Sequence, residues 1–252
     1  MPVRPAILFL IATLPLVCCA QSATLSLDQI VTRMEQVRAA ERDHNPAYTV
    51  TREYQLSAEG APPISDVVAE VSYVPPAEKE YVIVKSEGSE RGAGIVRKVL
   101  DHEASMASHW QPHAVSPDNY GFALLGRESL DGRDCYVLQL SPKRVAVELV
   151  RGKAWIDASD FHILRVAGET AKSPSIWLKK LTVTIDYGQV NGVWLETSTQ
   201  AVADVRFAGM HVLTSRDLDV RAASLSARAR KPRVRAQNRE HLVADTAAWV
   251  AR

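Results

Sequence analysis

The sequence has very little cysteine, and this excludes a disulfide-stabilised fold. Three of its 252 residues are cysteine, and two of them, Cys18 and Cys19, lie in the N-terminal segment. Cys135 is the only one in the rest of the chain, and a single cysteine forms no intramolecular disulfide. Because Cys135 lies in an apolar, strand-like segment, we expect a buried residue and not a reactive thiol.

Long apolar runs are also absent, apart from one near the N-terminus. Arg4 precedes an apolar run over 6–17, and small residues ending at Ala20 follow it. The run is shorter than the ~20 residues of a membrane-spanning helix. We therefore assign 1–20 to a cleaved secretory signal peptide. Acylation at Cys19, which would leave the chain anchored to lipid, is the alternative.

The net charge is only +1, but the charges are unevenly placed. Residues 222–252 carry seven Lys and Arg residues against Glu240 and Asp245. This asymmetry predicts a separate, flexible C-terminal extension. Its alternative role is to bind an anionic membrane surface or an envelope membrane protein. We expect no nucleic-acid partner for an exported chain, and we expect a monomer.

The remaining chain, 21–221, has the pattern of one β-rich domain. Ser26 and Gln29 have capping-box spacing, and Asn45-Pro46 ends the amphipathic helix predicted over 26–43. A second, short helix is expected after the glycines of 88–94, and a long loop over 105–117. The predicted strands are 48–56, 67–73, 81–84, 120–128, 135–140, 145–156, 162–168, 177–187, 193–205 and 210–220.

Tight-turn signals separate most of these strands. Asn191-Gly192 is the strongest, because both central residues of such a hairpin turn need positive φ. Consecutive strands joined in this way predict an antiparallel meander. We therefore expect an α+β, mostly β fold: a strongly curved antiparallel sheet forming an incomplete, half-open barrel, with two or three helices over its concave face.

Three fragments resemble catalytic or binding motifs, and each fails. In Gly92-Ala-Gly94-Ile-Val-Arg97 the third glycine of a dinucleotide fingerprint is replaced by Arg97. In His102-Glu-Ala-Ser-Met106 the second zinc ligand is a methionine, and Pro112 separates His109 from His113. Asp157 and Asp160 flank a turn, where such side chains bind their own backbone. The sequence predicts no catalytic residue, no metal site and no cofactor, and hence no enzyme.

Several segments together resemble the periplasmic outer-membrane lipoprotein carrier (LolA-like) superfamily, in its uncharacterised lipoprotein-sorting branch. They are the signal peptide, the first helix, 48–54, 73–81, 125–138 and 154–158. The resemblance covers about residues 25–221. It implies a periplasmic half-open barrel whose concave apolar face, lidded by helices, holds acyl chains.

The resulting hypothesis is a non-enzymatic periplasmic carrier or binding protein for lipid or lipoprotein acyl chains, involved in outer-membrane biogenesis. The alternative is an envelope-stress regulatory sensor that binds a membrane protein. Candidate cavity residues, chosen by strand parity and size, are Val71, Tyr73, Trp155, Trp177, Leu181, Val183, Ile185 and Trp194. Plain core packing also explains any single one of them.

Overall fold

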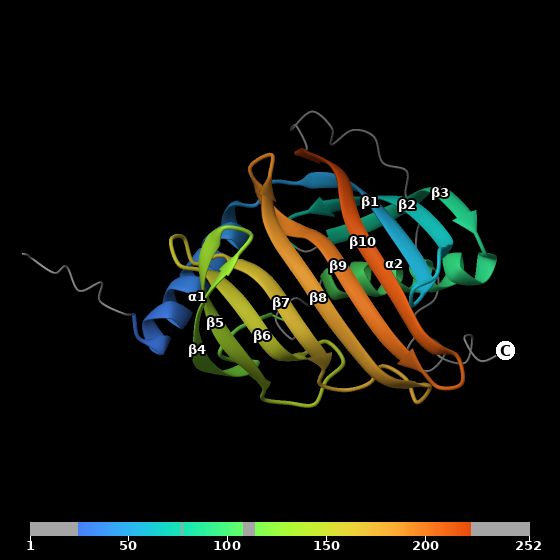
Figure 1. Ribbon diagram of the computed structural model, residues 1–252. Coiled ribbons are helices and arrows are strands. Elements are labelled where there is room, and N and C mark those ends of the chain that lie inside the picture. Colours follow the sequence, from blue (N-terminus) through green and yellow to red (C-terminus); the bar gives the residue numbers. More distant parts are fainter. Residues whose placement is uncertain (1–24, 77, 108–113, 223–252) are drawn as a thin grey trace, which may run out of the picture.

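A ten-stranded antiparallel sheet and two helices make up the fold (Figure 1). The computed structural model describes residues 25–76, 78–107 and 114–222. Within these ranges, none of the helices is both long and apolar enough to cross a membrane. The signal peptide and nearly all of the basic extension lie outside the described residues, so both remain predictions.

Helix α1 (Leu27–His44) begins at the predicted cap. The backbone N–H of Ser26 donates to Gln29 Oε1 at 2.9 Å, and the backbone N–H of Gln29 donates to Ser26 Oγ at 3.3 Å. This reciprocal capping box satisfies two otherwise unpaired N–H groups at the helix start. Helix α2 (Glu90–Ala107) is longer than predicted, because the glycine stretch around Gly92 lies inside its first turns.

All ten predicted strands exist. They are β1 (Tyr48–Ala58), β2 (Pro63–Val74), β3 (Glu78–Gly88), β4 (Tyr120–Leu130), β5 (Arg133–Pro142), β6 (Val150–Asp157), β7 (Ile163–Thr170), β8 (Leu178–Val190), β9 (Val193–Val205) and β10 (Gly209–Ala222). Only β6 starts clearly later than predicted: residues 143–149 form a connection, not strand. The Asn191-Gly192 turn has the expected positive φ angles, 51° and 82°.

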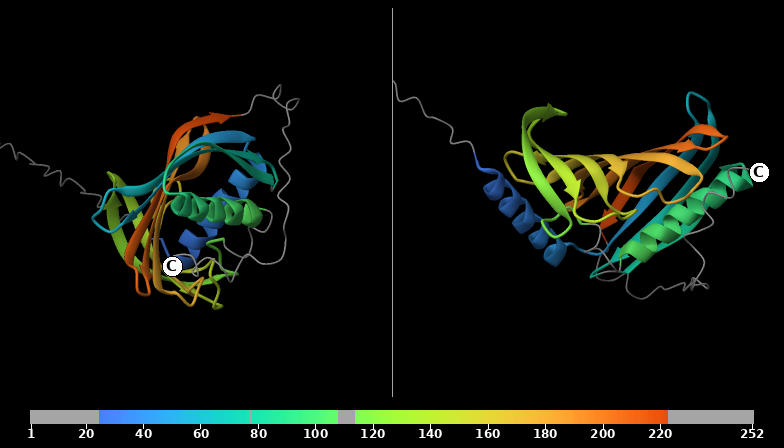
Figure 2. Two further views of the ribbon diagram at one scale, coloured as in Figure 1. Left: turned by 90° about the vertical axis from the view of Figure 1, so that its right-hand side faces the viewer. Right: turned by 90° about the horizontal axis from the view of Figure 1, so that it is seen from below.

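The strand order is β3-β2-β1-β10-β9-β8-β7-β6-β5-β4. The chain makes two meanders, and pairing of β10 with β1 joins them into one sheet. The edges, β3 and β4, do not pair with each other. The curved sheet therefore stays open, with both helices on its concave side (Figure 2). This confirms the half-open barrel predicted from the sequence.

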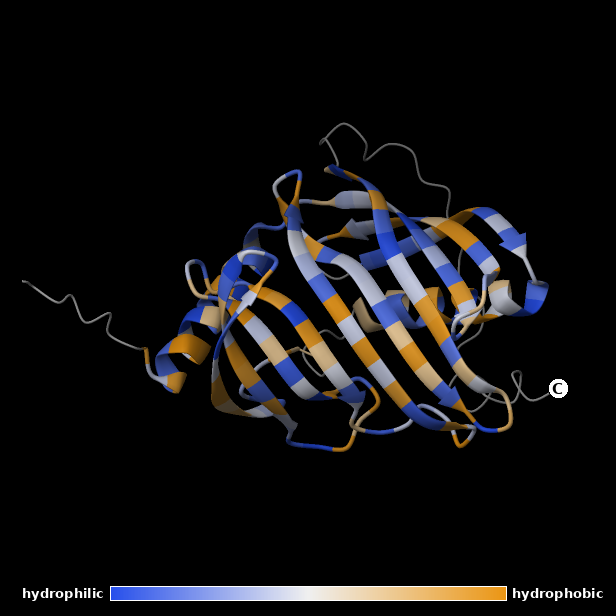
Figure 3. Ribbon diagram, viewed as in Figure 1, coloured by the Kyte–Doolittle hydropathy of each residue, from blue (hydrophilic) through white to orange (hydrophobic). Residues whose placement is uncertain are grey.

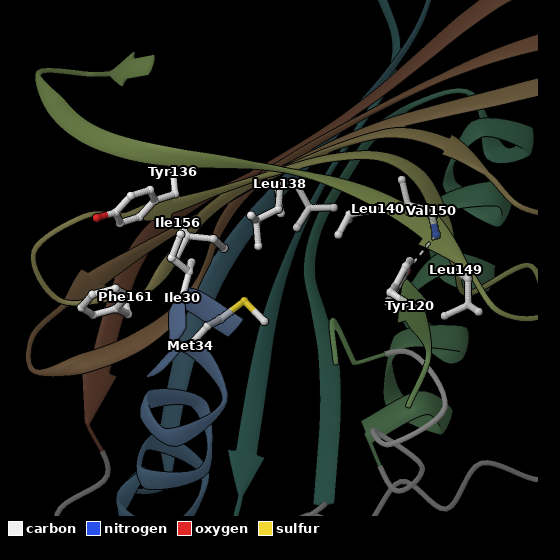
Figure 4. Close-up of a cluster of buried hydrophobic side chains, with 12 residues drawn as sticks. Ile30, Met34, Tyr120, Tyr136, Leu138, Leu140, Leu149, Val150, Ile156 and Phe161 are labelled. Atoms are coloured by element: carbon white, nitrogen blue, oxygen red, sulfur yellow. Dashed lines mark hydrogen bonds between the residues drawn. The ribbon is translucent and has the colours of Figure 1, made fainter. Parts of the chain in front are cut away.

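Two separate hydrophobic clusters attach the helices to the sheet. Ile30 and Met34 of α1 pack on Leu138 and Ile156 of the β4–β7 half (Figure 4). Val96 and Leu100 of α2 pack in a second cluster with Val50, Val67 and Val71 of the opposite half. Cys135 is buried in β5, as predicted. The middle parts of strands β8 to β10 lie between the two clusters, while Val193 and Leu195 of β9 and Val220 of β10 belong to the second one.

Candidate functional site

The candidate site is the part of the concave face that lies between the two helix-bound clusters. Side chains alternate between the two faces of each strand, and hydrophobic and hydrophilic residues alternate along much of the middle strands (Figure 3). Val166 belongs to the α1 cluster, so its cross-strand neighbour Ile185 also faces the concave side. On the same face, Val183 packs against that cluster.

Register carries this face across the central strands. Val183 is paired with Ala201, and Ala201 is paired with Leu213 of β10. Nearer the strand ends, Leu181 is paired with Ala203. We call these residues the central strip: Leu181, Val183, Ile185, Ala201, Ala203 and Leu213.

The central strip is apolar but only partly covered. All six of its side chains are intermediate in exposure, whereas the equivalent positions under the helices, such as Leu138 and Val67, are fully buried. Two of the six are alanines, which leave room above the sheet. The two helix-bound clusters border this partly exposed apolar strip on either side. Such a surface can accept an apolar ligand without any directional contact.

The structure brings together three of the eight candidate residues in this strip: Leu181, Val183 and Ile185. Val71 shares their face but is fully buried in the α2 cluster. Tyr73 lies two residues further along β2, where its hydroxyl donates to the carbonyl oxygen of Pro76 at 2.9 Å. Its ring lies 5.2 Å from that of Tyr48. Val71 and Tyr73 thus lie near the end of β2, outside the strip.

The three tryptophans lie apart from the strip. Trp155 is opposite Arg165, on the other face of the sheet from Ile156, and its indole N–H donates to Glu128 at 2.9 Å. Trp177 precedes β8 in the connection from β7. The ring of Trp194 lies 4.1 Å from that of His162, which in turn meets Glu41 of α1 at 2.7 Å.

Ala201, Ala203 and Leu213 were not among the candidates from the sequence. Small residues such as alanine are not signals of a cavity in a sequence, and the selection favoured large side chains. The Asn191-Gly192 turn does fix the pairing of β8 with β9. A bulge interrupts this register, however, because Asp186 is opposite Ser198 and Tyr187 is opposite Glu196. Simple counting from the turn therefore gives the wrong face beyond it.

A buried ion network joins α2 to the sheet beside the strip. Arg52 is 4% exposed, and its guanidinium donates from Nε to Asp217 at 2.6 Å and from Nη2 to the backbone oxygen of Glu196 at 2.6 Å. Glu103 of α2 lies 3.9 Å from Arg52 and accepts from Lys79 at 2.8 Å. The hydroxyl of Tyr54 also donates to Glu103, at 3.5 Å.

The network shifts the pKa values of its members. Burial disfavours the charge on Glu103, but the adjacent Lys79 and Arg52 outweigh it and lower the pKa of that carboxyl. Burial raises the pKa of Asp217 despite its hydrogen bond to Arg52. For Arg52, Glu196 and Asp217 outweigh burial and raise the pKa. These charges hold one another in place, so their evident role is to fix α2 over the sheet.

Glu103 and Asp157, which belong to fragments that resemble catalytic motifs, have structural partners. Glu103, from the zinc-like fragment, is engaged in the network described above. His109 and His113 lie outside the described residues. Asp157 Oδ1 accepts from the backbone N–H groups of Ser159 at 2.7 Å and Asp160 at 3.1 Å, which confirms its turn role. In the part of the chain that the structure describes, no group of three His, Cys, Asp or Glu side chains could hold a metal ion.

A separate hollow of about 290 Å³ lies near the β4–β5 turn. Its charged walls are already paired. Arg165 meets Asp186 at 2.5 Å, and Arg133 meets Asp157 at 2.6 Å. Since its ionic groups satisfy one another, this hollow offers no unpartnered charge to a ligand, and the central strip remains the better candidate.

Comparison with known proteins finds distant similarity. The sequence model of a family described as an uncharacterized protein matches residues 111–216. No curated protein matches the sequence. A LolA superfamily protein from Nitrosomonas europaea is 14% identical, with 80% of this chain and 96% of that chain covered and a TM-score of 0.44.

Two further structures extend the comparison. A putative outer membrane lipoprotein-sorting protein domain from Vibrio parahaemolyticus is 14% identical, with 76% and 91% of the chains covered and a TM-score of 0.44. In the MucA/MucB complex of Pseudomonas aeruginosa the matching chain is 11% identical, with 77% and 99% covered and a TM-score of 0.26. At these identities and scores the matches assign no function to this chain.

Proposed function

We propose that this protein is a non-enzymatic periplasmic binding or carrier protein that holds the acyl chains of a lipid or lipoprotein on its central strip. One observation carries the proposal: a helix packs on the concave face at each side, and the apolar, half-exposed central strip lies between the two helices, bordered by Thr199 and Ser215. A protein that needed only a stable core would gain by covering these side chains as well.

The free energy gained by burying an acyl chain must exceed the free-energy cost of association. Burying methylene groups contributes about 0.8 kcal/mol each, so ten of them contribute roughly 8 kcal/mol. Association costs about 4–15 kcal/mol in lost freedom. A sheet surface that covers one side of an acyl chain therefore binds it weakly. Val183 packs against the α1 cluster and Leu213 against the α2 cluster, so we expect the flanks of the two helices to supply the second wall that makes binding favourable.

The proposal is tested by titrating the full chain with a fluorescent fatty acid. Ala201→Phe places a ring in the strip, and we expect it to weaken binding at least about tenfold, since the ring occupies the volume of the ligand. Val202→Phe is the matched control. It is the next residue on the same strand, but it faces the other side of the sheet, opposite Thr182 and Val212, so binding should stay unchanged.

Equal loss in the two variants, or no uptake by the wild-type protein, would overturn the proposal. Mass spectrometry of lipid extracted from the purified protein gives an independent readout and identifies the ligand. A membrane protein recovered in stoichiometric amount, with no lipid bound, would instead favour the regulatory alternative.

A further inference from the structure

Three of the most exposed large apolar side chains in the described residues lie in three alternate connections of the sheet. Val145 is 74% exposed in the β5–β6 connection, Ile176 is 81% exposed in the β7–β8 connection, and Phe207 is 93% exposed in the β9–β10 turn. Single exposed apolar residues are ordinary on protein surfaces. Three in matching positions need an explanation.

The topology places these connections on one edge of the molecule. Strands β5 to β10 are neighbours in sequence order and antiparallel, so alternate connections lie on the same edge. They run along the lower edge in Figure 1. Strands lie ~4.8 Å apart, so neighbouring connections on this one edge, which are two strands apart, are separated by roughly 10 Å. Arg206 ties two of them together, donating from its backbone N–H to Trp177 O at 2.8 Å and from Nε to Ile176 O at 2.9 Å.

The conformation of Phe207 is the second observation. Its φ angle is +67°, in the left-handed region that bulky side chains rarely adopt and glycine adopts freely. Phe161 also has positive φ, but it is buried in the α1 cluster and stacks on Tyr136 with ring centroids 6.3 Å apart. Packing explains Phe161. An almost fully exposed Phe207 has no such packing, so its ring at this strained turn points to a role outside the fold.

Charge distinguishes this edge from the opposite one. In the three connections, four basic residues stand against Glu148 alone; they are Lys143, Arg144, Lys172 and Arg206. All four are exposed. On the opposite edge, the hairpin connections contain Asp131 and Asp160 and no Lys or Arg. One edge therefore combines apolar tips with positive charge.

We propose that this edge, the apolar-basic rim, docks on the surface of an anionic lipid bilayer. Its apolar tips are Val145, Ile176 and Phe207. Apolar side chains flanked by Lys and Arg match the bilayer interface, where the tips enter the headgroup region and the cations meet lipid phosphates. Three tips spaced along one edge suit a broad, deformable surface better than a pocket on a protein.

Flotation of the full chain with vesicles tests the rim. We expect binding to vesicles of phosphatidylcholine and phosphatidylglycerol at 7:3, and much weaker binding to phosphatidylcholine alone or at high salt, since screening weakens the attraction to anionic lipid. Phe207→Gly combined with Ile176→Ser should lower the partition coefficient at least about tenfold. Glycine suits the turn, so this variant should keep its thermal midpoint.

Val84→Ser is the matched control, because Val84 is 54% exposed on edge strand β3, away from the rim. Its binding should equal that of the wild-type protein. The rim is refuted if the double variant binds as well as the wild-type chain, if Val84→Ser loses as much, or if the wild-type chain does not bind these vesicles. Fatty-acid titration of the same variants keeps the two proposals separate, because the rim variant should retain uptake by the central strip.

Discussion

At the scale of single residues, Arg52 has the most demanding environment. It lies on the buried face of β1, the same face as Val50 and Tyr54. An arginine there is stable only because Asp217, Glu196 and Glu103 surround it. Removing one member of a buried ion network leaves the others uncompensated, and this costs more than the network contributes as a whole.

Arg52→Met tests that environment. The substitution keeps an unbranched apolar stem but removes the guanidinium and leaves buried carboxylates unpaired, so we expect a loss of about 3–5 kcal/mol in the free energy of unfolding. Arg216→Met is the control, because Arg216 pairs with Glu53 at 2.7 Å while its own side chain is 67% exposed. Its loss should stay below about 1 kcal/mol. Urea unfolding measures both, and similar losses would contradict this view of Arg52.

The sequence predicted the local features at this scale but not the buried ion network of Arg52. The Ser26–Gln29 cap and the Asn191-Gly192 turn were predictable, because their geometry depends on residues next to each other in the chain. The role of Arg52 depends on β10, far away in sequence. Its position on the buried parity of β1 was a usable signal, since a charged side chain there needs a partner.

At the scale of elements, α2 approaches β2 unusually closely. A Cβ atom at Gly92 would lie 2.5 Å from the Cβ of Ser65, closer than side chains pack. At Gly94, two residues later in the same helix, a Cβ atom would meet nothing within 4 Å. Tertiary packing, not helix propensity, therefore explains Gly92, and this is why the sequence suggested that the helix starts later.

Alanine at Gly92 and at Gly94 should change the free energy of unfolding in opposite directions. Gly94→Ala should stabilise the protein by about 0.5–1 kcal/mol, because alanine is the better helix former. Gly92→Ala should destabilise it by about 1–3 kcal/mol, since α2 must move off β2. Thermal or urea unfolding of the two variants checks this. A stabilising Gly92→Ala would show that the helix is not held this closely.

The contact between α2 and the sheet should also depend on pH. The pKa of Glu103 is lowered from its ordinary value of 4.5, mainly because Lys79 and Arg52 outweigh burial. Its ionised form therefore stabilises the fold above about pH 4.5, and this contribution is lost as the pH falls through the lowered pKa.

Glu103→Gln should therefore be less stable than the wild-type protein at pH 7, with the difference shrinking below about pH 4.5. Asp217, whose raised pKa acts in the other direction, is present in both proteins and largely cancels. Urea unfolding at several pH values measures the difference. A gap that stays constant down to pH 3.5 would contradict the assigned role of Glu103.

At the scale of the whole molecule, the central strip and the apolar-basic rim are continuous. Leu181 and Ala203 lie at the end of the strip closest to the β7–β8 and β9–β10 connections, where Ile176 and Phe207 lie. A rim resting on a bilayer would thus bring one end of the strip close to the lipid. The two proposals fit one path, from membrane to concave face.

The architecture at this scale was predictable from the sequence, while the composition of the site was not. Regular alternation and turn residues fix the number and direction of the strands. Which face lies under the helices depends on long-range packing, so Trp155 was chosen although it lies on the other side of the sheet from Ile156. Residues 145–149 resemble a strand in composition, but the ladder between β5 and β6 begins only at Gly152.

Photo-crosslinking with a diazirine-labelled fatty acid tests whether the central strip holds an acyl chain. After irradiation of the full chain and digestion, mass spectrometry locates the labelled residues. Binding in the strip predicts label on concave-face residues such as Val183, Ala201 and Leu213, removed by excess unlabelled fatty acid. Label confined to the opposite face, at Val202 or Val212, or label that no competitor removes, would contradict the account.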